Sequence, residues 1–318
     1  MHLKLSIIIP AYNAEKHIER CIHSLYEQDM ATNEYEVLVI NDGSTDQTLA
    51  VVERLCKQYP FVRLFSTINN GLSISRNKGI KASAGEYLLF LDADDCFRPH
   101  CLKTIYQEMS QNKLDMMLMN YRYLLPDGTD GKTGYHLEKN TERIVSGREF
   151  LLRNHYAPMI PLYAYRHSFL IERSLAFLPI GHEDEAFTPC AICQAQRIKY
   201  FPLTFYNYYQ NSESFMNNYN EKNFQDMIAA MHSIHLFKQK QEKDIEVATY
   251  LDSLIANRLI MIFKRSMRDG YNNQKELVCQ MKEAGLYPLK PKHPSFYTLL
   301  FNFSPTLFEA YYRLIKRK

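Results

Sequence analysis

Five short apolar runs, separated by stretches with helical periodicity, occupy the first 120 residues of the chain. They are Leu3–Pro10, Tyr35–Asn41, Phe61–Ser66, Glu86–Asp92 and Leu114–Asn120. The stretches between them place apolar residues three or four positions apart, which is the spacing of one face of a helix. A strand that is apolar on both faces has to be covered on both sides. The sequence therefore predicts an α/β fold with a mainly parallel sheet flanked by helices.

Polar residues follow three of these runs at the point where each run ends. The polar segments are Ala11–Asn13, Asp42–Ser44 and Asp92–Asp95. In parallel sheets of this kind, ligands bind beyond the carboxyl ends of the strands. We therefore expect one binding site, built from three strand ends, at this edge of the sheet.

The last of these segments places three carboxylates within four residues. At an extended strand end, Asp92 and Asp94 point to the same side and Asp95 to the other. Carboxylates this close repel one another unless a cation compensates. A Mg²⁺ ion that takes one or two carboxylates plus substrate phosphates is one explanation. An aspartate that caps the next helix is another, but it accounts for one aspartate and not for three.

Two other polar positions have both a structural and a functional explanation. Asp42 fits a short Asx turn at a strand end, and it also fits a carboxylate that accepts an N–H from a nucleobase. Arg76 and Lys78 fit partners for diphosphate charge, and they also fit solvated cations on a helix. From the residues alone, both explanations stay open.

Composition narrows the class of protein. Lys and Arg number 38 and Asp and Glu 35, and the net charge of +3 gives no overall case for nucleic acid as a partner. No run approaches the ~18 apolar residues of a membrane span, and the first apolar run is too short for a signal peptide. The seven cysteines are an odd number, which fits reduced thiols in the cytoplasm. Cys190 and Cys193 lack a second ligand pair at zinc spacing, so we expect two packed thiols.

Five segments, taken in order, resemble a known family. They are IIIPAYNAEKHIERCIHSL, VLVINDGSTDQT, NNGLSISRNKGI, AGEYLLFLDADD and GHEDEAF. Together they resemble the inverting nucleotide-sugar glycosyltransferases of family 2, which have the Rossmann-like GT-A fold. The resemblance covers about residues 3–215. We therefore expect a nucleotide-sugar-binding catalytic domain over 1–215 and a helical C-terminal region over 216–318.

The resemblance implies roles for residues of the first three segments. Pro10, Tyr12 and Asn13 match the family's first nucleotide-contacting loop. Asp42 matches the aspartate that reads the base, usually uracil. Arg76 falls where the family has an arginine beside the nucleotide.

The fourth segment matches the family's DXD motif at Asp92, Ala93 and Asp94. The resemblance implies that Asp94 is the more direct ligand of Mg²⁺ or Mn²⁺ and that Asp92 lies nearer the ribose. Asp95 extends the motif, and we expect it to cap the following helix.

The fifth segment contains Glu183 and Asp184, which resemble the family's ED motif, whose aspartate is the general base. Inverting transfer needs a base on the face opposite the leaving UDP, where it takes a proton from the attacking hydroxyl. A metal stabilises the departing diphosphate charge. The resemblance thus implies Asp184 as the base, with Glu183 at the nucleotide sugar. From the residues alone, acids in the first turn of a helix have an electrostatic explanation, and we expect His182 to be structural.

Three segments leave alternatives open. Tyr206–Met216 resembles the family segment that closes over the diphosphate, but it lacks the Gly and Arg often found there. The aromatic residues of Pro158–Arg173 either stack on a sugar acceptor or pack in the core. Ser295–Lys318, which is apolar with a basic finish, either lies on an anionic membrane surface or packs against the catalytic domain or a second subunit.

The sequence thus predicts an inverting, metal-dependent glycosyltransferase with a UDP-sugar donor. We expect a glycan or lipid-linked glycan acceptor in bacterial surface polysaccharide synthesis, a homo-oligomer, and peripheral contact with the inner face of the cell membrane. The alternatives are a non-catalytic nucleotide-sugar-binding protein and a sugar nucleotidyltransferase. A binding protein needs no base, and the segment PAYNAEKH has no glycine for the Gly-rich phosphate loop of a nucleotidyltransferase.

Overall fold

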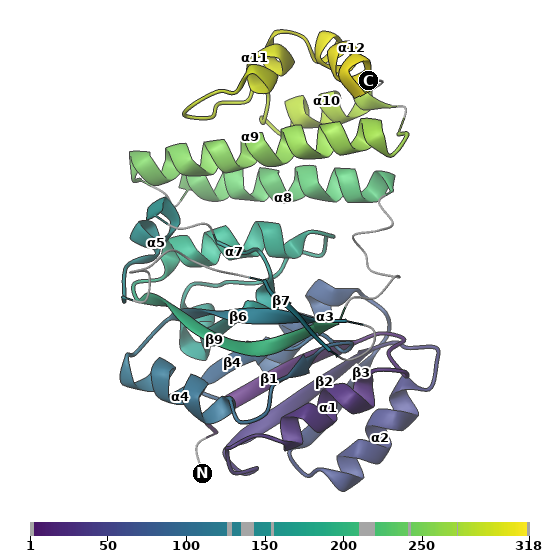
Figure 1. Ribbon diagram of the computed structural model, residues 1–318, viewed down its shortest axis with the longest axis vertical. Helices are drawn as coiled ribbons and strands as arrows, with labels where there is room; N and C mark the ends of the chain where they lie inside the picture. The colour runs from purple at the N-terminus through teal and green to yellow at the C-terminus, as the bar shows by residue number, and fades with distance from the viewer. Residues whose placement is uncertain are drawn as a thin grey trace. The chain divides into compact units, whose positions relative to one another are not determined.

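The computed structural model describes residues 3–125, 129–134, 143–153, 156–209, 220–240, 243–271 and 273–316 (Figure 1). The chain forms two compact units. The first consists of Met1–Pro179 and Gln194–Asn211, and the second of Ile180–Cys193 and Ser212–Lys318. The boundary predicted between residues 215 and 216 lies outside the described residues, and the two predicted domains stay a prediction.

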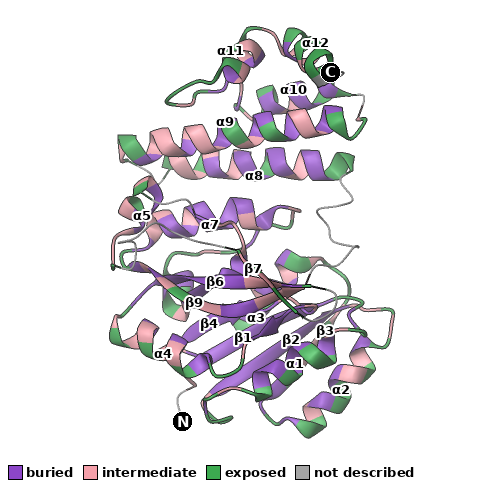
Figure 2. Cartoon of the chain, viewed as in Figure 1, coloured by how far each residue is buried: buried purple, intermediate pink, exposed green. Residues whose placement is uncertain are grey.

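The strands of the first unit form one sheet in the order β3-β2-β1-β4-β8-β6-β9-β5, with β7 paired to β6. The four strands at one end of this order are parallel to one another: β1 (Leu5–Ala11), β2 (Tyr35–Asp42), β3 (Val62–Thr67) and β4 (Tyr87–Phe90). Figure 2 shows β1 and β2 buried along their length. The first four apolar runs therefore form a parallel sheet, as expected, whereas the fifth lies in β6, in the other half of the sheet.

The other half of the sheet mixes directions. It contains β5 (Cys96–Phe97), β6 (Met116–Leu124), β7 (Asp130–Thr133), β8 (Tyr163–Arg166) and β9 (Ile198–Tyr209). Here β8 runs antiparallel to both β4 and β6, whereas β9 runs parallel to β6. Tyr163 and Tyr165 of β8 are fully buried. Of the two explanations for the aromatic residues of Pro158–Arg173, packing in the core is therefore the correct one for these two tyrosines.

Helices cover the parallel half of the sheet on both faces. Helices α1 (Ile18–Tyr26) and α2 (Thr48–Gln58) lie on one face, and α3 (Leu72–Ala82) lies on the other (Figure 1). Gly79 allows α3 to approach the sheet closely, because a Cβ atom there would come within 2.3 Å of the Ile8 side chain. The remaining helices of this unit are α4 (Leu102–Gln111), α5 (Gly147–Arg153), α6 (His167–Glu172) and the 3₁₀ turn Ile160–Leu162.

The second unit is helical, which confirms the predicted helical C-terminal region. Its helices are α7 (Glu183–Gln194), α8 (Glu221–Lys240), α9 (Ile245–Arg268), α10 (Gln274–Glu283), α11 (Phe296–Phe303) and α12 (Pro305–Lys316). Helices α8 and α9 lie side by side (Figure 1). Over the described parts of the chain, no helix is both long and apolar enough to span a lipid bilayer.

Candidate functional site

The loops that follow β1 and β2 are hydrogen-bonded to each other. The backbone N–H of Asn13 donates to Ser44 Oγ at 3.0 Å, and Asn13 Oδ1 accepts from the backbone N–H of Thr45 at 2.9 Å. The same two loops have another contact two residues later in the first loop, where the backbone N–H of Glu15 donates to Asp46 Oδ2 at 3.1 Å. Asn13 has a positive φ of 49°, a conformation that asparagine tolerates better than most residues. Two of the three predicted strand ends therefore form one rim.

The carboxylate of Asp42 connects this rim to the start of α3. Asp42 is buried, and its Oδ1 accepts from the backbone N–H of Asn70 at 3.0 Å. Its Oδ2 accepts from the backbone N–H of Gly71 at 2.7 Å. These N–H groups precede the first turn of α3, where backbone donors have no partner within the helix. Asp42 therefore fixes the position at which α3 begins.

The Asx turn expected here involves Asn41 and not Asp42. Asn41 Oδ1 accepts from the backbone N–H of Ser44 at 3.3 Å. Between them Gly43 has a φ of +69°, and a Cβ atom at this position would lie 2.6 Å from the backbone nitrogen of Asn69. Glycine is therefore required by both conformation and space. The turn is explained without Asp42, whose carboxylate has the separate contacts described above.

Helix α3 brings Arg76 to the third strand end. The buried guanidinium of Arg76 donates to Asp92 Oδ1 at 3.0 Å and lies 5.6 Å from the centre of the Phe177 ring. Part of the positive charge required by the acidic segment is therefore supplied by the chain itself. Lys78 has a different contact, because its ammonium donates to the Thr67 hydroxyl at the end of β3.

Asp95 does not cap a helix, and this expectation was wrong. The chain continues from Asp95 into β5, and α4 begins only at Leu102. Asp95 is buried, its Oδ2 accepts from the Tyr206 hydroxyl at 2.5 Å, and its Oδ1 accepts from the backbone N–H of Tyr209 at 2.8 Å. Both donors come from β9, so Asp95 attaches the acidic segment to the far half of the sheet.

Burial raises the pKa of Asp95 well above its ordinary value, and the charges of Asp94 and Asp92 raise it further. A cation approaches the same segment from α1. The guanidinium of Arg20 donates to the backbone carbonyl of Asp94 at 2.5 Å and lies 3.4 Å from the centre of the Tyr209 ring. Sequence reasoning missed Arg20 and did not connect Tyr206 or Tyr209 with the acidic segment, since no local pattern links these residues to it.

The second unit holds the remaining predicted acids. Glu183 and Asp184 open α7, and Asp184 Oδ1 accepts from the backbone N–H of Glu185 at 2.8 Å. Glu185 is buried and forms an ion pair with Arg258 at 2.9 Å. His182 precedes the helix with a φ of 63°, and burial lowers its pKa to about 4. The imidazole is therefore neutral near pH 7, which agrees with a structural role.

Comparison with known proteins identifies the family. The model of the family "Glycosyl transferase family 2" matches residues 6–176. The chain belongs to glycosyl transferase family 2. Its sequence is 29% identical over 219 residues to the uncharacterized glycosyltransferase YibD of Escherichia coli, a match that covers 66% of this chain and 62% of that protein. It is 30% identical over 200 residues to the poly(ribitol-phosphate) beta-N-acetylglucosaminyltransferase TarS of Staphylococcus aureus, over 62% of this chain and 34% of TarS.

A solved structure shares the fold of this chain well beyond the residues that the family model matches. The structure of S. aureus TarS 1-349 in complex with UDP-GlcNAc superposes with a TM-score of 0.74 at 20% identity, over 99% of this chain and 91% of that one. This likeness confirms the predicted GT-A type fold with a helical C-terminal region. The chain spans less than two thirds of the lengths of the curated relatives YibD and TarS.

Within this family 2 domain, the remaining predicted residues of the DXD and first-loop segments lie on the same rim. Pro10 is buried in β1 beside Ile40 of β2. Tyr12, in the loop after β1, is 51% exposed, which leaves its ring accessible to a ligand. Ala93 is a small buried residue between Asp92 and Asp94. Of the predicted diphosphate segment Tyr206–Met216, residues 206–209 form the end of β9, and the remainder, with Gln210, Ser212, Ser214 and Met216, falls outside the described residues.

The family 2 domain offers carboxylates for a metal at Asp92 and Asp94. The side chain of Asp92 is 32% exposed despite its ion pair with Arg76, and Asp94 is half-buried. In the described part of the chain, no group of three or more His, Cys, Asp or Glu residues could hold a metal by itself. This donor set fits Mg²⁺, which takes one or two carboxylates and completes its shell with water and phosphate oxygens. Cys190 and Cys193 lie on α7 and form no disulfide.

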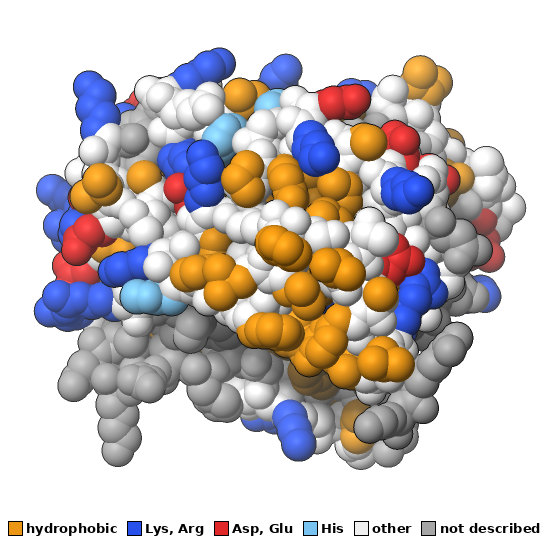
Figure 3. Space-filling view, turned by 90° about the horizontal axis from the view of Figure 1, so that it is seen from above, with side chains coloured by type: hydrophobic (Ala, Val, Ile, Leu, Met, Phe, Trp, Pro, Cys, Tyr) orange, Lys and Arg blue, Asp and Glu red, His pale blue; other side chains and the backbone are white. Residues whose placement is uncertain are grey.

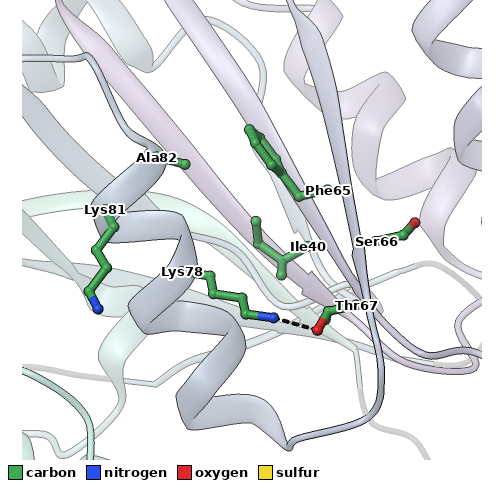
Figure 4. A pocket seen from close by; sticks show the side chains of 7 residues that line it. All are labelled: Ile40, Phe65, Ser66, Thr67, Lys78, Lys81 and Ala82. Carbon is green, nitrogen blue, oxygen red and sulfur yellow. Dashed lines mark hydrogen bonds between the residues drawn. The ribbon is translucent and has the colours of Figure 1, made fainter.

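A cavity of about 390 Å³ lies between α3 and the ends of β2 and β3 (Figure 4). Ile40 and Phe65 contribute apolar surface, and Lys78 and Lys81 approach from the helix. Lys78, a candidate partner for diphosphate charge, is among the residues that line it, but Tyr12, Asp42, Arg76 and the DXD residues of this family 2 domain are not. The predicted site is therefore the rim of strand ends and not this cavity.

Proposed function

We propose that this family 2 protein is an inverting, metal-dependent glycosyltransferase that moves a sugar from a UDP-sugar to an acceptor hydroxyl. The observation that best supports the proposal is a continuous set of contacts along the rim. Asp42 binds the N–H groups at the start of α3, and Arg76 of the same helix binds Asp92. A base-reading residue and a metal- and ribose-binding residue are thus held by one rigid element.

The rim residues have separate roles in this proposal. Asp42 accepts the imino N–H of uracil, because each carboxylate oxygen has two lone pairs and only one hydrogen bond at each is needed for α3. Tyr12 presents its exposed ring to the nucleotide. Arg76 holds Asp92 in place beside the ribose, and the carboxylates of Asp94 and Asp92 hold Mg²⁺ or Mn²⁺. The bound ion supplies positive charge for the leaving diphosphate.

Asp184 is the proposed general base, with Glu183 beside it at the nucleotide sugar. The acceptor oxygen forms a bond to the anomeric carbon of the sugar from the face opposite UDP, and the bond between that carbon and the diphosphate oxygen breaks. The electron pair of the broken bond leaves with UDP. The proton of the acceptor hydroxyl moves to the Asp184 carboxylate.

The curated relatives support a polysaccharide as the acceptor. The name of TarS gives poly(ribitol-phosphate) as its acceptor. A chondroitin synthase of Pasteurella multocida is 35% identical over 133 residues, which cover 42% of this chain and 14% of that protein. We therefore propose a glycan or lipid-linked glycan acceptor in bacterial surface polysaccharide synthesis. A cytoplasmic location and a homo-oligomer stay predictions.

Calorimetry with UDP, in the presence and absence of Mn²⁺, followed by incubation with a panel of UDP-sugars, tests the function. We expect metal-dependent UDP binding and slow hydrolysis of at least one UDP-sugar. Binding without hydrolysis or transfer would indicate a non-catalytic nucleotide-sugar-binding protein. Formation of a UDP-sugar from a nucleoside triphosphate and a sugar phosphate would indicate a nucleotidyltransferase.

A further inference from the structure

Helices α11 and α12 expose an unusual amount of apolar surface. Phe303 is 80% exposed and Leu314 is 67% exposed. Phe296, Leu299, Leu307, Tyr311 and Ile315 are also exposed on these two helices. Figure 3, which looks down on this end of the chain, shows apolar side chains gathered into one patch with Lys and Arg side chains around it. Exposed apolar side chains gathered into one patch on a protein surface commonly mark a site of interaction.

The patch belongs to one ordered structure. The rings of Phe296 in α11 and Tyr311 in α12 lie 5.4 Å apart, which joins the outer surfaces of the two helices. On the inner side, Phe263 of α9 lies 4.9 Å from Phe301 and 5.7 Å from Phe308. The two helices therefore have their own buried contacts with α9. The exposed apolar side chains are not the ones that attach α11 and α12 to α9.

The segment that carries the patch is rich in basic residues and poor in acidic ones. Residues 286–318 contain six Lys and Arg residues and a single acid, Glu309. The net charge of the segment is +5, whereas the whole chain carries +3, so the other 285 residues carry −2. Glu309 is paired with Arg313 at 3.0 Å, and Lys290 and Lys292 are exposed just before α11. The apolar patch is thus placed within a basic segment of the sequence.

We propose that the outer surface of α11 and α12 docks on an anionic lipid membrane. A helix that lies in the membrane interface buries its apolar face among the lipids and places basic side chains near the anionic headgroups. Tyrosine at the edge of such a face, as at Tyr311, is typical of membrane interfaces. A second copy of the chain fits less well, because two identical patches that meet across a twofold axis would bring two segments of net charge +5 together.

Co-sedimentation of the full chain with lipid vesicles tests this proposal. We expect binding to vesicles of phosphatidylcholine mixed with phosphatidylglycerol, weaker binding to phosphatidylcholine alone, and release as salt rises. The double substitution Phe303→Ser and Leu314→Ser should lower the partition coefficient about tenfold or more, because two apolar side chains no longer enter the interface. Both side chains are exposed, so the variant should fold normally.

Ile245→Ser is the matched control for the apolar patch, since Ile245 is also 80% exposed but lies at the start of α9. Lys290→Gln with Lys292→Gln tests the charge, and Lys222→Gln with Lys243→Gln, both at exposed positions, is its control. We expect the first charge pair to weaken binding to anionic vesicles about tenfold or more and the control pair to have much less effect.

Three results would overturn the proposal. The wild type could fail to bind anionic vesicles, the Ile245 control could weaken binding as much as the patch variant, or the wild type could elute as a dimer that the patch variant converts to a monomer. UDP binding, measured on the same samples, is independent of these results. Loss of the membrane proposal with intact UDP binding is therefore distinguishable from failure of the proposed enzymatic function.

Discussion

The hydroxyl of Tyr206 donates a hydrogen bond to Asp95 at 2.5 Å, and this contact fixes the acidic segment after β4 to β9. Asp95 is buried, so its carboxyl depends on the few donors around it. We predict that Tyr206→Phe lowers the free energy of unfolding by about 1–3 kcal/mol, since it removes a donor from a buried acid. Urea denaturation measures the change.

Tyr163→Phe is the control for this prediction. Tyr163 also has a buried ring, and its hydroxyl donates to the neutral backbone carbonyl of Ala157 at 2.9 Å. Its loss should cost only about 1 kcal/mol, the net contribution of an ordinary hydrogen bond, whereas the buried Asp95 carboxyl has only the Tyr206 hydroxyl and the Tyr209 N–H as donors among the described residues. Equal losses for the two variants would show that the contact with Asp95 has no special importance.

The two backbone contacts of Asp42 lead to a second prediction. In Asp42→Asn the amide keeps one acceptor oxygen, and its NH₂ group then faces the backbone N–H of either Asn70 or Gly71. We expect a loss of stability of about 1–3 kcal/mol from the unpaired buried donor, together with weaker UDP binding because α3 and Arg76 move. Denaturation and calorimetry measure the two effects.

Asn41→Ala is the control, because it disturbs the turn and leaves the Asp42 carboxylate in place. Asn41 Oδ1 accepts the backbone N–H of Ser44 in this turn. This variant should lose about 1 kcal/mol of stability and keep most of its UDP affinity. If Asp42→Asn also bound UDP as tightly as the wild type, Asp42 would not read the base.

Local sequence was sufficient to predict the parallel half of the sheet and its rim. Strands β1, β2 and β4 are buried along their length, and the polar residues that were expected to converge lie at or just after their carboxyl ends. The contact between Arg76 and Asp92 joins residues only 16 positions apart, on one helix and the strand that follows it. Short strand–helix–strand units restrict the geometry enough for such inferences.

Contacts between distant parts of the chain could not be predicted in this way. Asp95 and Tyr206 are 111 positions apart, and Arg20 and Asp94 are 74 apart. Strand β5 has two residues, and β8 has four, which is too short for a recognisable pattern. A helix-capping role was therefore the natural local explanation for Asp95, although a strand formed much later in the sequence supplies its donors.

A third prediction concerns the proposed base. Asp184→Asn should lower the rate of sugar transfer by about 10²–10⁴-fold, because an amide cannot take the proton of the acceptor hydroxyl. UDP affinity should be unchanged. Transfer assays and calorimetry on the same preparation measure both quantities.

Glu246→Gln is the matched control, since Glu246 also lies in the first turn of a helix of the second unit, α9. It should leave transfer unaffected. An Asp184→Asn variant with full activity would exclude Asp184 as the base, and equal losses in the two variants would point to a general effect of charge.

The buried imidazole of His182 makes stability depend on pH. Burial lowers its pKa from 6.5 to about 4, with a smaller opposing influence from Asp226 and a smaller reinforcing one from Arg265 and Arg258. As pH falls below 6.5, the unfolded chain takes up a proton at this position and the folded chain does not. The free energy of unfolding should therefore fall between pH 6.5 and about 4, by at most about 3 kcal/mol.

His182→Asn removes the titrating group, and asparagine tolerates the positive φ of 63° at this position. We expect the stability of this variant to fall less than that of the wild type as pH decreases from 6.5 to about 4, whereas the two should change in parallel above 6.5. Urea denaturation at a series of pH values measures the difference. Parallel curves throughout that acidic range would mean that His182 becomes protonated in the folded protein as readily as in the unfolded chain.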